Sequence, residues 1–112
     1  MVVNGYETKT KFWDDFSIAD RFGMDAIKDT YNRAFDAWKD NVEYVTELVL
    51  VLNWKCWDYY RKGLNKLSDL YSKLYYKCHH YCCSHLKGKD FDYYFNIVAS
   101  HCMFSSSGAS LL

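Results

Sequence analysis

The stretch that decides the fold is residues 42–62, VEYVTELVLVLNWKCWDYYRK. Apolar side chains fill every position from Leu48 to Leu52, while the flanks on both sides keep the spacing of a helix. A helix that is apolar nearly all round is covered by neighbours on more than one side. We therefore predict that residues 42–62 form the central helix of an all-α domain.

Further helices are expected on both sides of this one. Ile27, Tyr31, Ala34 and Trp38 recur at spacings of 4, 3 and 4, which marks one helical face. The 112-residue chain contains no proline and five glycines, which disfavours an all-β domain with many turns. The expected fold is a small helical bundle of four main helices plus a short N-terminal helix, over residues 13–22, 25–39, 42–62, 65–86 and 91–103.

The chain is expected to hold one domain. Residues 12–104 form the helical domain, residues 1–11 a flexible N-terminal tail, and residues 105–112 a disordered C-terminal tail. No signal peptide is recognised, and the uncharged run from Leu48 to Trp54 is too short to span a bilayer. We expect a cytoplasmic protein with reduced cysteines. The expected core residues are Trp38, Leu48, Leu52, Trp54, Leu70, Leu74 and Val98.

Charge is balanced in total and uneven along the chain. Fourteen basic side chains match fourteen acidic ones, which removes the usual electrostatic case for binding nucleic acid. Residues 1–55 carry ten acidic and seven basic side chains, and residues 56–112 carry four acidic and seven basic ones. The paired acids Asp14 and Asp15, with Asp20, are interpreted as partners of a helix dipole.

One cluster could carry chemistry, the segment KCHHYCCSH at residues 77–85. Zinc takes four thiolate or imidazole ligands, and Cys78 and Cys82 lie one helical turn apart. An antiparallel return of the last helix would supply His101 or Cys102 as further ligands. The favoured interpretation is plain core packing with no cofactor, because cysteine is among the most buried residue types.

Catalysis by a thiol is the weaker possibility for the same segment. Cys83 lies four residues from His79, which would place a thiol near a base. No third group to orient the histidine is apparent from the sequence. An enzyme is therefore not expected.

Tyrosine doublets at 59–60, 75–76 and 93–94 are the other unusual feature. Adjacent helical residues point in different directions, so one ring of each doublet can be buried while the other lies nearer the surface. Interfaces favour tyrosine and arginine, although such rings also cover core edges. The predicted partner-binding surface is Tyr60, Arg61, Lys62, Lys73, Tyr76 and Lys77.

A longer block of sequence carries a family resemblance. The run FWDDFSIADRFGMDAIKDTYNRAF (12–35), then AWKDN (37–41), YVTELVLVLNWK (44–55) and Trp57, resembles a family of small uncharacterised helical proteins. These are carried by phages and mobile elements of Gram-positive gut bacteria. A weaker similarity, LKGKDFDYYFNIV, continues over residues 86–98. The resemblance implies a protein that binds and blocks host defence machinery, as anti-CRISPR proteins do, and it brings no catalytic residues.

The expected function is therefore a non-enzymatic, phage-type interaction protein that inhibits a host defence complex. In its concrete form it occludes a Cas nucleoprotein effector, with no membrane partner. The alternative is a nucleic-acid-binding regulator that uses the basic fourth helix. A zinc- or thiol-dependent enzyme is the third and least favoured class.

Overall fold

A computed structural model describes the backbone of residues 3–103 and the side chains of residues 12–101. The elements are α1 (Val3–Phe22), α2 (Met24–Trp38), α3 (Val42–Arg61), α4 (Asn65–His85), α5 (Lys89–Val98) and a π-helical turn, η1 (Ala99–Met103). No strand occurs in this part of the chain. The all-α prediction is confirmed.

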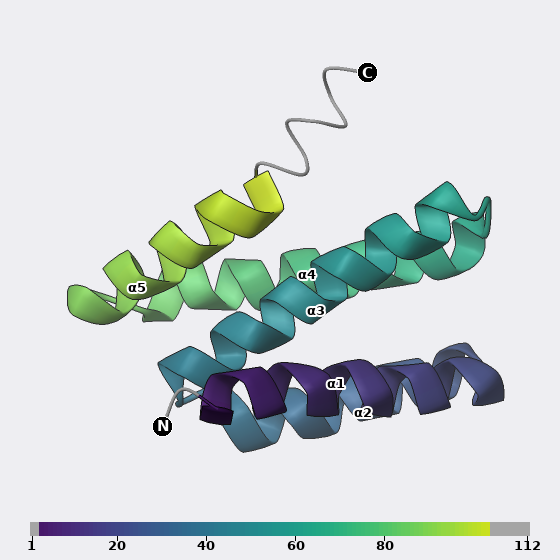
Figure 1. Ribbon diagram of the computed structural model, residues 1–112, viewed down its shortest axis with the longest axis horizontal. Helices are drawn as coiled ribbons and strands as arrows, with labels where there is room; N and C mark the ends of the chain where they lie inside the picture. Colours follow the sequence, from purple (N-terminus) through teal and green to yellow (C-terminus); the bar gives the residue numbers. More distant parts are fainter. Residues whose placement is uncertain (1–2, 104–112) are drawn as a thin grey trace.

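Helix α3 lies at the centre of the arrangement. In Figure 1, α1 and α2 lie together as one layer below α3, while α4 runs back beside α3 and α5 returns above it. Contacts join α3 to α1, α2, α4, α5 and η1. The consecutive apolar residues Leu48–Leu52 are all buried, as a helix covered on several sides requires. The prediction of a central helix is confirmed.

The beginning of α3 shows why the chain turns there. The Tyr44 backbone N–H donates to the Asn41 side-chain oxygen at 3.1 Å. This bond satisfies one of the amide groups that a helix start leaves without an internal partner. At the other end, Gly63 has a φ of 78°. Its conformation lets the Leu64 N–H bond back to the Tyr59 carbonyl at 2.9 Å.

Two helix boundaries differ from the sequence prediction by more than two residues. Helix α1 begins at Val3 and spans 20 residues, so it is not the short helix predicted over residues 13–22. It takes in most of the segment that was assigned to an N-terminal tail. The last predicted helix ends earlier, at Val98, and continues as the π-helical turn. The predicted tail at 105–112 lies outside the described residues.

The core matches the sequence prediction in its aliphatic part. Leu48, Leu52, Leu70, Leu74 and Val98 are at most 7 % exposed. The two predicted tryptophans, Trp38 and Trp54, are only half-buried and pack against the edge of the core. Large aromatic rings fill the interior instead, namely Phe12, Phe16, Tyr31, Tyr71 and Tyr94. Within residues 3–103, no helix has both the length and the hydropathy needed to cross a membrane.

Candidate interaction surfaces

An ion pair lies inside the bundle between α1 and α3. Lys55 is 3 % exposed, and its Nζ lies 3.1 Å from Asp20 Oδ2. The same ammonium donates to Ser17 Oγ at 2.7 Å and lies 4.2 Å from the centre of the Trp13 ring. A buried charge is tolerated when it is paired and hydrogen-bonded in this way.

Two tyrosines complete this cluster. The hydroxyls of Tyr59 and Tyr71 both donate to the Asp20 carboxylate. Burial, followed by the hydrogen bond to Asp20, raises the pKa of both phenols, so they stay protonated donors. The interpretation of Asp14, Asp15 and Asp20 as helix-dipole partners is wrong, because α1 begins at Val3, which puts Asp14 and Asp15 in its middle and Asp20 near its other end. Asp20 instead ties α1 to α3 and α4.

The Cys78–His85 segment divides between the core and the surface. Cys78 and Cys82 are fully buried. A hydrogen bond with Cys82, together with burial, raises the pKa of the Cys78 thiol. His101 is exposed and lies edge-on to Trp54. Cysteines 56, 78, 82 and 83 are all in the free thiol form.

The predicted zinc ligands are only partly described. The side chain of Cys102 lies outside the described residues. Among side chains 12–101, no three from histidine, cysteine, aspartate and glutamate gather as metal ligands. The zinc site formed by Cys78, Cys82 and His101 or Cys102 stays a prediction.

At the surface side of the segment, the Cys83 thiol and the His79 imidazole are in contact, and the imidazole also contacts a phenol of α5. Cys83 Sγ lies 3.6 Å from His79 Nε2. His79 Nδ1 lies 2.5 Å from the hydroxyl of Tyr94, which is fully buried. Tyr94 is the third orienting group that the sequence did not reveal. Burial, with the charge of Cys82, raises the pKa of Cys83, which disfavours a thiolate nucleophile.

The outer face of α4 forms a hollow of about 640 Å³. It brings together three residues of the predicted partner surface, Lys73, Tyr76 and Lys77, and Tyr76 is 64 % exposed. The hollow is completed by His79 and Cys83, which the sequence analysis discussed only as a thiol near a base, and by His80.

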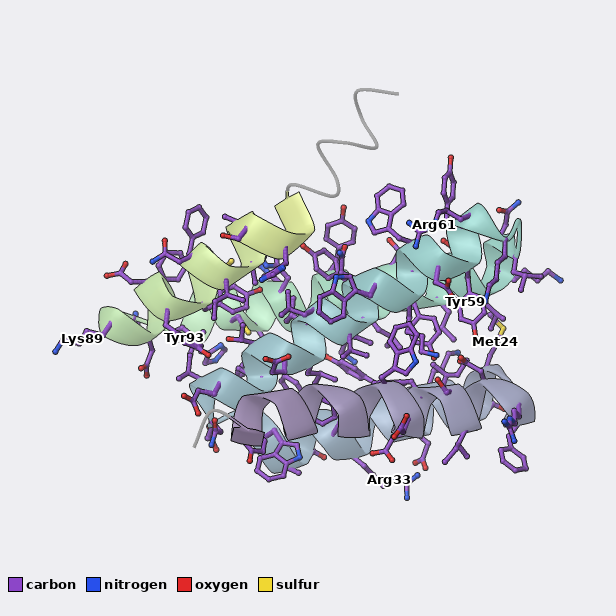
Figure 2. All side chains as sticks on the ribbon, viewed as in Figure 1. Met24, Arg33, Tyr59, Arg61, Lys89 and Tyr93 are labelled. Atoms are coloured by element: carbon purple, nitrogen blue, oxygen red, sulfur yellow. The ribbon has the colours of Figure 1, made fainter. Side chains whose placement is uncertain are left out.

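The other three predicted residues, Tyr60, Arg61 and Lys62, lie at the C-terminal end of α3 and do not line this hollow. Tyr60 packs edge-on against Trp57, and Lys62 pairs with Asp58 at 3.0 Å. Figure 2 shows Arg61 at this end of α3. The predicted surface is therefore divided into two places.

A second concave surface, the α1–α2 groove, was missed by the sequence analysis. It has a volume of about 670 Å³. Two large apolar side chains stand on its α1 side, Ile18 at 55 % exposed and Phe22 at 77 % exposed. Figure 2 shows Arg33 pointing outward from this lower layer. The groove is lined by Phe12, Asp15, Ile18, Ala19, Phe22, Ala26, Asp29, Thr30, Arg33, Ala34, Ala37 and Trp38.

A signal for this groove was present in the sequence. Ile18 and Phe22 are four residues apart, so they share one face of a helix. That face lies beside the buried stripe of Phe12, Phe16 and Ala19, and Phe12 and Ala19 also line the groove. Two neighbouring apolar residues outside the core stripe of a helix indicate a second contact surface.

Comparison of the chain with protein families, with curated proteins and with solved structures found no match.

Proposed function

We propose that this protein is a non-enzymatic interaction module that binds a protein partner through the α1–α2 groove and blocks it. The observation that carries the proposal is the exposure of Ile18 and Phe22 beside a concave surface. Contiguous exposed apolar patches mark interaction sites in soluble domains. Covering a side chain of this size contributes about 1.5–3 kcal/mol, so the pair would supply a substantial part of a binding energy.

The charges around the groove favour a basic protein surface as the partner. Residues 12–38 carry six acidic and three basic side chains, and five of the acids remain near the surface because Asp20 is paired with Lys55 inside the bundle. At the groove, Arg33 is already paired with Asp29 at 2.9 Å. An acidic surface repels bare nucleic acid and attracts the basic surfaces that bind it. A nucleoprotein complex offers such surfaces wherever it holds its nucleic acid.

The concrete version rests on the family resemblance. It is a phage- or mobile-element-borne protein that acts in the host cytoplasm as an anti-CRISPR inhibitor. It would occlude the nucleic-acid channel of a Cas effector by covering its basic protein surface. No chemical step and no cofactor are needed for this action.

The test compares two matched exposed aromatic residues on different surfaces. Phe22→Asp places a charge in the α1–α2 groove, whereas Tyr60→Asp places one at the end of α3. Purified Cas effectors from Gram-positive bacteria are assayed for DNA cleavage with each variant, and circular dichroism verifies folding. We expect the wild type and Tyr60→Asp to inhibit cleavage, and Phe22→Asp to lose inhibition by about tenfold or more, as loss of about 1.4 kcal/mol implies.

A capture experiment covers partners other than Cas effectors. The tagged wild type and both variants are incubated with lysate of a Gram-positive host, and bound proteins are quantified by mass spectrometry. We expect a bound complex that resists nuclease and depends on Phe22. If Phe22→Asp leaves both inhibition and every captured protein unchanged, the groove is not the binding surface.

The second candidate function is a nucleic-acid-binding regulator, and the hollow on α4 favours it. Lys73 and Lys77 flank the exposed Tyr76 ring there. Ammonium groups that contact phosphates, with an aromatic ring for base stacking, are typical of single-strand binding. Binding of this kind weakens steeply with salt. A Lys73→Glu/Lys77→Glu double variant would abolish it without affecting the α1–α2 groove.

A further inference from the structure

The contact between Cys83, His79 and Tyr94 has a geometry that plain core packing does not require. His79 and Cys83 lie four residues apart on α4, so both side chains are on one face. Tyr94, from α5, holds the Nδ1 side of the imidazole. The Nε2 side lies near the Cys83 thiol and lines the hollow on α4.

We propose that His79 Nε2 and Cys83 Sγ form a zinc-binding pair, open to solvent on the side of the α4 hollow. Two side chains at i and i+4 on one helix face are a spacing that holds zinc in other proteins. Zinc binds imidazole nitrogen at about 2.0–2.1 Å and thiolate sulfur at about 2.3 Å. In a tetrahedron these bond lengths place the two ligand atoms about 3.6 Å apart. The Sγ–Nε2 distance is 3.6 Å, so the two atoms are close enough to share one zinc ion once the Cys83 side chain turns toward the Nε2 lone pair.

Tyr94 supplies the outer contact that metal-binding histidines need. The second ring nitrogen of such a histidine is held by a hydrogen-bonding partner, which fixes the tautomer and the ring orientation. The Tyr94 hydroxyl can accept from the Nδ1–H, and this leaves the Nε2 lone pair for the metal.

One movement is needed to form the site. Cys83 Sγ also lies 4.0 Å from His79 Nδ1, so the sulfur sits beside the ring and not on the outward line of the Nε2 lone pair. Cys83 is exposed, and a turn of its side chain brings the sulfur into line. No third histidine, cysteine or carboxylate joins the pair among side chains 12–101. Water from the hollow therefore fills the other coordination positions.

This assignment differs from the zinc site predicted from the sequence. That prediction used Cys78 and Cys82, which are fully buried beside Tyr31. The His79–Cys83 pair is solvent-accessible and needs no rearrangement of the core. Zinc there would replace the thiol proton and would leave the bundle's packing unchanged.

The experiment titrates Zn²⁺ into tag-free, reduced full-length protein that has been treated with a chelator. Calorimetry gives the affinity, the stoichiometry and the protons released. Co²⁺ substitution gives an independent signal, because thiolate coordination produces a charge-transfer absorption. We expect one zinc per chain, about one proton released per zinc and the thiolate–Co²⁺ band. Both Cys83→Ser and His79→Gln should abolish the band and weaken zinc binding by more than about tenfold.

Matched variants decide between the possible locations. His80→Gln changes the neighbouring histidine of the same hollow, and Cys102→Ser changes a ligand of the sequence-predicted site; both should bind as the wild type does. Tyr94→Phe keeps the buried ring, removes the hydroxyl and should weaken binding by about 10–100-fold. Equal zinc affinity in Cys83→Ser and the wild type would overturn the proposal. So would loss of binding in Cys102→Ser with binding retained in Cys83→Ser.

Discussion

Two groups of buried and half-buried polar side chains join the helices of this bundle, and they differ in charge. The charged cluster consists of Ser17, Asp20, Lys55, Tyr59 and Tyr71, and it joins α1 to α3 and α4. The neutral cluster consists of Tyr31, Cys78, His79, Cys82 and Tyr94, and it joins α2, α4 and α5.

This difference in charge determines how strictly each cluster fixes the positions of the helices that it joins. In the charged cluster, the Asp20 carboxylate accepts from Lys55, Tyr59 and Tyr71 at once, so a small shift of α1 would leave a buried charge without a donor. In the neutral cluster, thiols and rings behave largely as apolar groups with weak polar preferences. The charged cluster should therefore be intolerant of substitution, and the neutral cluster more tolerant.

The largest effect is expected for Lys55→Met. This change keeps much of the side-chain volume but leaves Asp20 buried without its cation, which costs about 3–5 kcal/mol. The matched control is Lys62→Met, because Lys62 also pairs with an aspartate at 3.0 Å but is 58 % exposed. Exposed pairs contribute about 0–1 kcal/mol. Urea unfolding measures both, and equal small losses would remove the distinction between the clusters.

An apolar benchmark comes next. Leu52 is fully buried on α3, and Leu52→Ala should cost about 2–5 kcal/mol through lost burial and the cavity left behind. Thermal or chemical unfolding of this variant measures the stability lost when ordinary core packing is disturbed, and the losses in the two clusters can be compared with it. A loss below about 1 kcal/mol would contradict the central position of α3.

A smaller effect is expected in the neutral cluster. Cys78→Ser replaces a thiol with a hydroxyl at a fully buried position, which costs about 1–3 kcal/mol when the hydroxyl gains no strong partner. Cys78→Ala tests packing alone and should be milder than the serine variant. A loss as large as that of Lys55→Met would show that the neutral cluster is as demanding as the charged one.

The smallest effect is a pH dependence that originates at His79. Burial, with the charge of His80, lowers its pKa below the usual value of about 6.5. The unfolded chain then binds the proton more readily, so stability falls as pH drops through about 6.5 toward the folded-state pKa. The groups that face this imidazole are His80, Cys83, Tyr75 and Tyr94. His79→Gln should reduce the pH dependence of the unfolding midpoint between about pH 7 and 5. An unchanged pH dependence in this variant would show that another group titrates in this range.

The spacing of apolar residues predicted α2, α3 and α4 closely, because the apolar faces of these helices and the glycines near their ends are visible in the sequence. The predicted helix began at residue 13, whereas α1 begins at Val3. Residues 3–11 show no apolar period, but extending an existing helix by one residue adds a hydrogen bond without the cost of nucleation. The helix therefore continues to Val3, where periodicity alone predicted a tail.

The candidate sites were predicted less well, for a different reason. Lys73, Tyr76 and Lys77 were found as a group because they share one helix. The partners of Asp20 come from α3 and α4, and the Tyr94 hydroxyl reaches His79 from α5. Such contacts depend on how helices pack, and helical spacing within one segment carries no information about them.

The charged cluster also has a consequence for the order in which the helices assemble. Asp20 reaches partners 35, 39 and 51 residues further along the chain, whereas Ser68 on α4 bonds to Cys56 on α3 across only 12 residues. Closing the longer loops carries the greater entropy cost. We therefore expect the α3–α4 hairpin to form early and α1 to dock last. In native-state hydrogen exchange, α1 amides should open first, and a partner bound in the α1–α2 groove would slow that opening.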